Sequence, residues 1–221
     1  MAAAELRYAL LVFDWDGTLI DSAGTIAECI QAASRDMGLP VPDHERASHV
    51  IGLGLRDSLR HAVPDLPRER YLDFAELYRR YFLARESAMS LFAGVPQLLS
   101  ELARRGHTLA VATGKSRAGL DRALAASGLG AHIRASRCAD ETNPKPHPAM
   151  LLELMQELDA QPHRVLMIGD TSHDLEMARN AGVDAVAVTY GAHPERALRA
   201  LEPRACVSSV EGLARWLAQN G

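Results

Sequence analysis

Short apolar runs alternate with segments of helical periodicity along most of this chain. Four apolar runs predict buried strands, and the segments that separate them predict helices. The strands are expected at Tyr8–Phe13, Thr108–Ala112, Val165–Ile168 and Ala185–Val188, and the helices at Val95–Arg105, Arg117–Ser127, Pro148–Leu158 and Leu175–Ala181. This alternation predicts an α/β fold, a doubly wound and mostly parallel sheet with helices on both faces. The pair His132–Ile133 is a candidate for one more strand.

Residues 20–90 interrupt this alternation. One helix is indicated there by four apolar residues at helical spacing, Ile26, Ile30, Ala33 and Met37. A second long helix is expected to begin near Pro67, and it carries five of the nine Tyr and Phe residues. We interpret that aromatic stripe as packing within a small helical bundle. The sequence therefore predicts an α-helical cap at 20–90, inserted into an α/β core formed by 1–19 and 91–221, and able to act as a lid.

Composition and charge indicate which kinds of molecule this protein does not bind. Hydrophobic residues make up 48% and charged residues 24%, and the net charge of −4 comes from interspersed acids and bases. That balance does not indicate nucleic-acid binding. No apolar stretch approaches the ~18 residues that span a membrane, and residues 1–7 lack the features of a signal peptide. Three scattered cysteines favour a reducing compartment over a disulfide framework. We expect a cytoplasmic monomer or homodimer without nucleic-acid or membrane partners.

The first predicted strand ends in Asp14-Trp15-Asp16-Gly17-Thr18, where two carboxylates lie two residues apart. Ligand sites in parallel α/β sheets lie beyond the carboxyl ends of the strands. A carboxylate is ionised at neutral pH and can attack phosphorus, so Asp14 is a candidate nucleophile. Asp16 is placed to protonate the leaving alcohol and then to deprotonate the attacking water. On this motif alone, a polar turn rich in Asp and Gly stays an open alternative.

Two further segments predict a phosphate site. Thr113 and Gly114 follow the second predicted strand and precede a helix, where a hydroxyl and a backbone amide can bind phosphate oxygens. An N-cap role for the neighbouring Ser116 is the alternative, and the spacing is not that of a P-loop. Lys145 stands among three alternating prolines, which hold it rigidly before a helix. Its ammonium can offset the repulsion between Asp14 and a phosphate, although a solvated surface lysine is the usual alternative.

Asp170 and Asp174 follow the strand predicted at Val165–Ile168. Being four residues apart, they share one face of a helical turn. Oxygen ligands from Asp14, the backbone carbonyl of Asp16, and Asp170 suit Mg²⁺. Asp174 is expected to position these ligands without binding the ion itself. Ser172, His173 and Asp174 spell the letters of a catalytic triad, but adjacent residues cannot converge as a triad does. We interpret His173 as a loop residue.

In this order, the four motifs resemble those of the haloacid dehalogenase-like hydrolases, and the resemblance covers essentially the whole chain. It rests on Asp14 with Asp16, Thr113, Lys145, and Asp170 with Asp174. The helical insertion resembles the small α-helical cap of that family, and the flanks Thr18–Ser22 and Asn180–Gly182 resemble its phosphoglycolate phosphatase branch. The resemblance implies a Mg²⁺-dependent phosphatase that hydrolyses a small phosphomonoester through an aspartyl-phosphate. Trp15 stands where the family usually has an aliphatic residue or Phe, and we expect it to change packing rather than chemistry.

Other functions use the same core. A pyrophosphatase or a nucleotide phosphatase would need the same residues. A phosphoglucomutase-type isomerase usually carries Glu-Asp at the fourth motif, where this chain has Gly169-Asp170, and this difference favours hydrolysis. A regulatory protein on an inactivated scaffold is disfavoured because all the expected catalytic side chains are present. For selectivity, Arg56 in the cap is a candidate contact to an anionic or polar substrate group, the alternative being a surface arginine packed on the cap.

Overall fold

One sheet of six parallel strands forms the centre of the part of the chain that the computed structural model describes, residues 6–221. Its order is β3-β2-β1-β4-β5-β6. The strands are β1 (Leu10–Phe13), β2 (Thr108–Thr113), β3 (Ala135–Cys138), β4 (Val165–Gly169), β5 (Asp184–Val188) and β6 (Ala205–Val207). Residues 1–5 lie outside the described residues. The expectation that residues 1–7 are not a signal peptide falls mostly on them. The parallel sheet confirms the predicted fold class.

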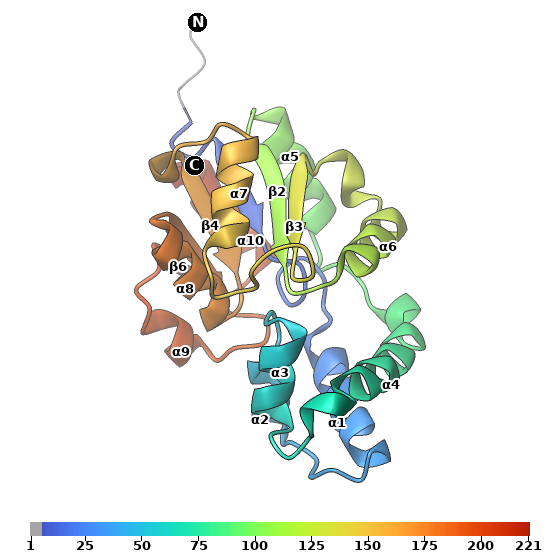
Figure 1. Ribbon diagram of the computed structural model, residues 1–221. Helices are drawn as coiled ribbons and strands as arrows, with labels where there is room; N and C mark the ends of the chain where they lie inside the picture. Colours follow the sequence, from blue (N-terminus) through green and yellow to red (C-terminus); the bar gives the residue numbers. More distant parts are fainter. Residues whose placement is uncertain (1–5) are drawn as a thin grey trace, which may run out of the picture.

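Helices cover both faces of the sheet (Figure 1). Leu11 and Phe13 of β1 pack in one cluster with α5 (Val95–Arg104), α6 (Arg117–Ser127) and α10 (Val210–Asn220). Leu10 and Val12 point to the opposite face and pack with α7 (Ala149–Glu157) and α8 (Ser172–Ala181). Burial on both faces explains why the central strands are continuous apolar runs rather than alternating patterns. The short helix α9 (Glu195–Arg199) packs beside β5 and α8.

Four helices between β1 and α5 form a second body, the cap, at one end of the sheet (Figure 1). They are α1 (Ala23–Asp36), α2 (His44–His49), α3 (Leu55–Ala62) and α4 (Tyr71–Leu83). Their apolar residues make a separate cluster in which Phe74 and Phe82 are buried. The two chain segments that enter and leave the cap are joined by an antiparallel bridge between Ile20 and Leu91. This bridge supports domain boundaries near residues 20 and 90, which stay a proposal.

The edge strands are where the sequence-based predictions fail. β3 is Ala135–Cys138, whereas the strand expected at His132–Ile133 is wrong. Those two residues follow a 3-10 turn, in which the His132 amide donates to the Leu129 carbonyl. β6 was not predicted, because its apolar run is only three residues long and these residues are half-buried at the sheet edge. The described 3-10 turns are Arg68–Arg70, Glu86–Ala88, Leu129–Ala131 and Pro162–Arg164. Among residues 6–221, no helix is long and apolar enough to cross a membrane.

Candidate active site

The sheet order brings three of the four motifs together. Asp14 comes directly after β1, Thr113 is the last residue of β2, and Asp170 comes directly after β4. β1 pairs with β2 on one side and with β4 on the other, so all three residues lie at the same edge of the sheet. The Asp14 amide donates to the Ile168 carbonyl at 2.9 Å, which extends the ladder one residue past β1.

Lys145 joins this group through two buried ion pairs. Its Nζ lies 2.5 Å from Asp14 Oδ1 and 2.6 Å from Asp174 Oδ1, and all three side chains are at most 1% exposed. Burial raises the pKa of the Asp14 carboxyl well above its ordinary value, and the Lys145 ammonium opposes this rise. Burial alone would lower the pKa of Lys145, but the two carboxylates outweigh it and raise that pKa. The lysine therefore stays charged between two acids.

Asp170 is held by two hydrogen bonds. Its Oδ1 accepts from the Thr18 hydroxyl at 2.8 Å, and its Oδ2 accepts from the Ala192 amide at 2.7 Å. A side chain on Gly17 or Gly191 would collide with this carboxylate, and Gly17 also has a φ of +81°. Both positions therefore need glycine. Burial and the nearby Asp174 raise the pKa of Asp170 from 3.8 to about 7.

The first turn of α8 fixes Asp174. The Thr171 hydroxyl donates to Asp174 Oδ2 at 2.7 Å, and the Thr171 amide donates to the same oxygen at 3.0 Å. The Asp174 amide donates in return to the Thr171 hydroxyl oxygen, which completes a capping box. Asp174 thus orients the Lys145 ammonium with one oxygen and caps a helix with the other.

Asp16 lies on the cap side of this group. Its Oδ1 accepts from the Ser22 hydroxyl at 2.8 Å and lies 3.0 Å from Lys115 Nζ. The Lys115 ammonium also sits over the Phe82 ring of the cap, 4.6 Å from its centroid. Lys115 was not among the predicted site residues. The sequence shows the Thr113–Ser116 segment that carries Lys115. The partners of its ammonium, Asp16 and Phe82, come from two segments far away along the chain.

The cap loop between α2 and α3 rests on the predicted phosphate site. Thr113 is buried, and its hydroxyl oxygen accepts from the Lys115 amide at 3.2 Å. A Cβ atom on Gly114 would come within 2.8 Å of the Gly52 carbonyl carbon and oxygen, so glycine allows the loop to approach. Gly114 therefore has a role at the cap–core contact besides the predicted one toward phosphate.

Two core histidines hold the same loop. The Nε2 atoms of His173 and His193 lie 2.7 Å and 3.1 Å from the His49 carbonyl at the end of α2. His193 Nδ1 accepts from the Ser172 amide, which leaves the proton on Nε2 to donate to that carbonyl. The interpretation of His173 as a loop residue is wrong: it is buried in the first turn of α8.

The residues of the acidic cluster fit a divalent cation. Carboxylate oxygens of Asp14, Asp170 and Asp174 lie within 4.8 Å of one another. Asp14 Oδ2 is buried and has no hydrogen-bond partner among the described residues. A hard cation with oxygen ligands would satisfy this oxygen and compensate the negative charge. The side chain of Asp16 is outside this cluster, and the role of its backbone carbonyl as a ligand stays a prediction.

A cavity of about 360 Å³ opens from Asp14 and Asp16 into the cap. Its walls come from α1, the α2–α3 loop, α3 and α4 of the cap, and from the Gly114–Gly119 segment and Arg122 of the core. Arg56 is not part of this lining and faces a separate hollow with Arg68 and Tyr71. Arg79 and Arg122, which were not predicted, line the main cavity instead.

Comparison with known proteins identifies the family. The family model described as "Haloacid dehalogenase-like hydrolase" matches residues 11–188, which include all the motifs described above. The chain belongs to the haloacid dehalogenase-like hydrolases. A hydrolase from Pseudomonas syringae has the same fold, with a TM-score of 0.88 at 20% identity, covering 96% of this chain and 98% of that one.

Phosphatases are found among the curated relatives of this haloacid dehalogenase-like chain. A protein of Dickeya dadantii (strain 3937) named "Probable phosphatase IndB" is 37% identical over 219 residues, with 94% of each chain covered. A phosphoglycolate phosphatase of Mesorhizobium japonicum is 30% identical over 219 residues, which cover 96% of this chain and 95% of that one. The family and these relatives show that the protein is a phosphomonoester hydrolase.

Proposed function

We propose that the protein hydrolyses a small phosphomonoester in two steps, through a phosphoryl group carried on Asp14. The observation that carries this proposal is the buried Lys145 ammonium, 2.5 Å from Asp14 and 2.6 Å from Asp174. A lysine in that position offsets the charge of a nucleophilic carboxylate and of an incoming phosphate dianion. The Thr113 hydroxyl and the Gly114 amide would bind the remaining phosphate oxygens.

In the first step an Asp14 oxygen attacks phosphorus, and the bond from phosphorus to the alcohol oxygen breaks. Asp16 in its protonated form gives its proton to the departing alcohol oxygen. In the second step Asp16, now a carboxylate, takes a proton from water, which attacks the phosphorus of the acyl phosphate. Phosphate leaves and the Asp14 carboxylate is restored. General acid–base help of this kind contributes roughly 10²–10⁴-fold in rate.

The fold family implies a divalent cation, and we propose Mg²⁺, held by Asp14, Asp170 and the backbone carbonyl of Asp16. When bound, the ion supplies positive charge to the phosphate oxygens and to the attacking carboxylate. Asp174 supports the site by orienting Lys145 and by capping α8. Thr18 and the Ala192 amide fix the orientation of Asp170. Gly17 and Gly191 leave room for that carboxylate.

A phosphoglycolate-like substrate, a cytoplasmic location and a monomeric or dimeric state stay predictions. So does the contact between Arg56 and substrate. A mutase stays less favoured than a hydrolase, because Gly169 stands where the mutase branch usually has Glu. A Cβ atom at this position would collide with Asp174. A pyrophosphatase or nucleotide phosphatase remains compatible with the same core residues.

The test is phosphate release from a panel of phosphomonoesters, nucleotides and pyrophosphate, with Mg²⁺ or with EDTA. We expect release that depends on Mg²⁺ and is abolished in Asp14→Asn, whose circular dichroism spectrum should match that of the wild type. Release that survives the loss of Asp14 would overturn the mechanism. Transfer of phosphate between positions of a sugar, without release, would support the mutase instead.

A further inference from the structure

The cavity above Asp14 and Asp16 is much larger than the leaving group of a two-carbon acid requires. Its volume of about 360 Å³ lies in the range of pockets that bind whole small molecules. The two catalytic aspartates form its floor, so a phosphate bound there directs the rest of the substrate into the cap. The walls of the cavity therefore determine which alcohol can leave.

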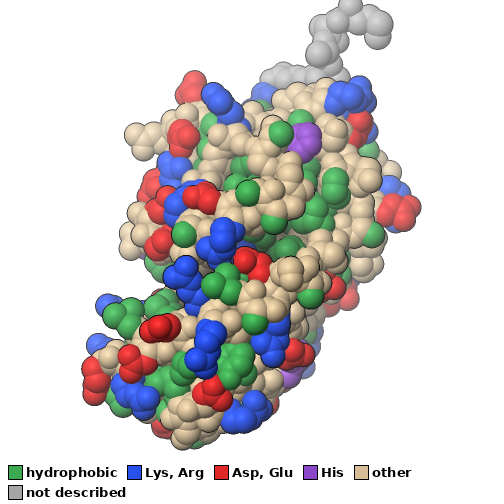
Figure 2. Space-filling model, turned by 90° about the vertical axis from the view of Figure 1, so that its right-hand side faces the viewer, with side chains coloured by type: hydrophobic (Ala, Val, Ile, Leu, Met, Phe, Trp, Pro, Cys, Tyr) green, Lys and Arg blue, Asp and Glu red, His purple; other side chains and the backbone are tan. Residues whose placement is uncertain are grey.

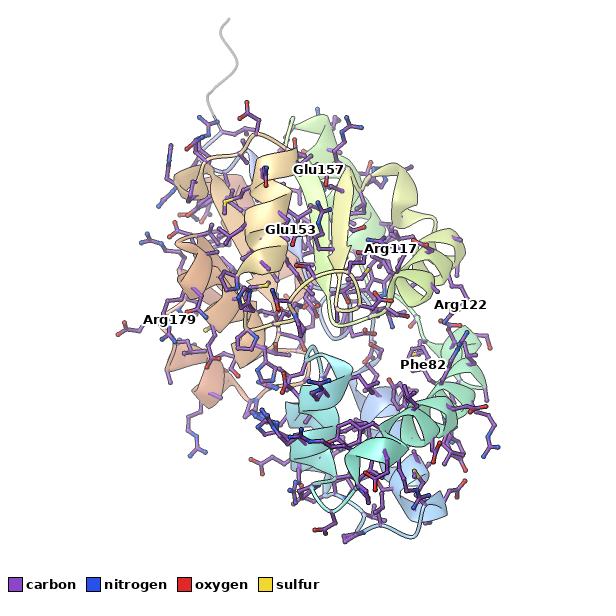
Figure 3. All side chains as sticks on the ribbon, viewed as in Figure 1. Phe82, Arg117, Arg122, Glu153, Glu157 and Arg179 are labelled. Carbon is purple, nitrogen blue, oxygen red and sulfur yellow. The ribbon has the colours of Figure 1, made fainter. Side chains whose placement is uncertain are left out.

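One wall of the cavity is aromatic. Phe74, Tyr78 and Phe82 are spaced four residues apart, which places them in a row on one face of α4, and all three line the cavity. Tyr78 and Phe82 lie 5.9 Å apart in a stacked arrangement. Figure 3 shows Phe82 on the side of α4 that faces the core. The stripe that we interpreted as cap packing thus has a second role at the cavity surface.

The cavity also has an aliphatic lining. Ile26 and Ile30 from α1 and Leu59 from α3 face the same space, and each is at most 7% exposed. An apolar group in the cavity would contact both these side chains and the aromatic row of α4. Such contacts favour an aromatic ring, since ring faces and edges pack well against both kinds of side chain.

The basic residues of the cavity do not offer a site for a second anion in its interior. Lys115 is paired with Asp16 at 3.0 Å, and Arg122 reaches from α6 to Glu86 at 3.5 Å. Arg79 is exposed, so it lies at the rim. Figure 3 shows Arg122 between α6 and α4, and Figure 2, which faces this side, shows Lys and Arg side chains near the junction of the two bodies. A carboxylate deep in the cavity would thus lack a free cation.

The interior instead offers weak polar groups. The Tyr78 hydroxyl has no hydrogen bond within the described part of the chain, and Tyr78 is half-buried. The Ser58 hydroxyl donates toward the Val50 carbonyl at 3.2 Å, which leaves its oxygen able to accept. These groups suit a ring that carries a hydrogen-bonding edge.

From this lining we infer that the cap selects phosphomonoesters whose alcohol carries an aromatic ring, joined to the phosphate by a short linker. The inference rests on the proposed function and names its substrate class. The phosphate binds at Asp14, Thr113 and Lys145, and the ring contacts the aromatic row of α4 and the aliphatic side chains of α1 and α3 that line the cavity. A two-carbon acid such as glycolate would leave most of this cavity unfilled.

The experiment compares three phosphomonoesters of primary alcohols in the presence of Mg²⁺: ethyl phosphate, 2-cyclohexylethyl phosphate and 2-phenylethyl phosphate, with phosphoglycolate beside them. The leaving groups are all primary alkoxides, so differences in kcat/KM report contacts in the cavity rather than leaving-group chemistry. We expect kcat/KM for 2-phenylethyl phosphate to exceed that for ethyl phosphate about 10- to 100-fold, the gain from burying a ring-sized apolar group. It should exceed that for the cyclohexyl compound about 2- to 10-fold, through aromatic contacts.

A matched pair of variants locates the ring. Ala75 is half-buried on α4 and lines the cavity, whereas Ala84 follows α4 and is exposed. In Ala75→Trp the ratio of kcat/KM for 2-phenylethyl phosphate to that for ethyl phosphate should fall at least about tenfold, because the indole fills the cavity. Ala84→Trp should keep the wild-type ratio. If Ala75→Trp does not fold, the series on the wild-type protein carries the test.

The outcomes distinguish failure of the inferred aromatic selectivity from failure of the proposed phosphatase function. Hydrolysis of phosphoglycolate or ethyl phosphate at least as efficient as that of 2-phenylethyl phosphate would overturn the inference and leave the proposed function standing. Equal efficiency with the cyclohexyl compound would overturn the aromatic preference. An equal loss of the ratio in both tryptophan variants would place the ring outside the cavity. Release of phosphate from none of the compounds, with a folded protein, would overturn the proposed function and the inference with it.

Discussion

Asp14, Asp170 and Asp174 place three carboxylates around one buried ammonium, that of Lys145. Taking several charges out of water is costly unless each finds a partner. Lys145 is paired with two of the acids, and the third, Asp170, accepts two hydrogen bonds. The remaining negative charge and the unpartnered Asp14 Oδ2 are what a divalent cation would compensate.

The raised pKa of Asp170 makes the stability of the metal-free protein depend on pH. The folded state keeps this proton up to about pH 7, whereas the unfolded chain loses it near 3.8. Between these values the folded state binds more protons, so the stabilising contribution is complete below the lower value and is lost as pH rises through about 7. Bound Mg²⁺ needs the ionised carboxylate and should reverse this trend.

We therefore predict that Mg²⁺ raises the thermal midpoint more at about pH 8 than at about pH 5, because metal and proton compete for the same carboxylate. Differential scanning calorimetry with Mg²⁺ or with EDTA measures the effect. Asp170→Asn should lose most of this Mg²⁺-dependent increment. An equal increment at both pH values in the wild type would remove Asp170 from the ligand set.

At the level of single elements, α8 shows how one helix terminus serves the site. Its first turn contains the capping box between Thr171 and Asp174, and the same Asp174 holds Lys145. We predict that Thr171→Val destabilises the protein by about 1–2 kcal/mol, through loss of the side-chain cap. Urea unfolding measures this, and Thr171→Ser, which keeps the hydroxyl, should retain most of the stability. A valine variant as stable as the wild type would show that the box contributes nothing.

The central elements could be predicted from the sequence because they are buried on both faces. The runs that became β1, β2, β4 and β5 are mostly apolar, and α6 occupies the predicted Arg117–Ser127. β3 and β6 at the sheet edges were not predicted: β3 reads Ala-Ser-Arg-Cys and only its last residue is buried, and β6 is an apolar run of only three residues. α8 begins three residues before the predicted Leu175, because its first turn is filled with polar and charged residues.

Some residues of the candidate site could likewise be predicted from the sequence, and others could not. The predicted residues are visible in the local sequence: Asp14 and Asp170 follow strands, Thr113 ends one, and Lys145 stands in a proline-rich loop. Lys115 and the two cap-binding histidines could not be found, since their partners come from segments far along the chain. Their positions depend on how the cap meets the core, which no local pattern encodes.

For the whole molecule, the contact between cap and core decides access to the cavity. The His49 carbonyl receives two imidazole hydrogen bonds from the core, and the loop that follows it lies against Gly114. The cap core and the sheet cores are separate apolar clusters. Because the two bodies have separate cores, the contact between them can open without unfolding either.

We predict that His173→Phe loosens this contact. Loss of one hydrogen bond, worth about 1 kcal/mol, should speed amide hydrogen exchange in residues 50–54 about fivefold. Hydrogen-exchange mass spectrometry measures this directly. The matched control is His107→Phe, which removes a buried imidazole that bonds the Tyr8 carbonyl in the core. Unchanged exchange in His173→Phe, or an equal change in both variants, would show that His173 does not hold the loop.

The measurement that tests the two-step mechanism most directly is a burst experiment on Asp16→Asn with 4-nitrophenyl phosphate. This leaving group needs little protonation, so Asp14 should still take the phosphoryl group, whereas the second step has lost its base. We expect a rapid burst of about one nitrophenolate per protein, then slow turnover. Mass spectrometry of acid-quenched protein should find the phosphoryl group on the peptide that contains Asp14. Steady release without a burst, and without phosphorylated Asp14, would contradict the account.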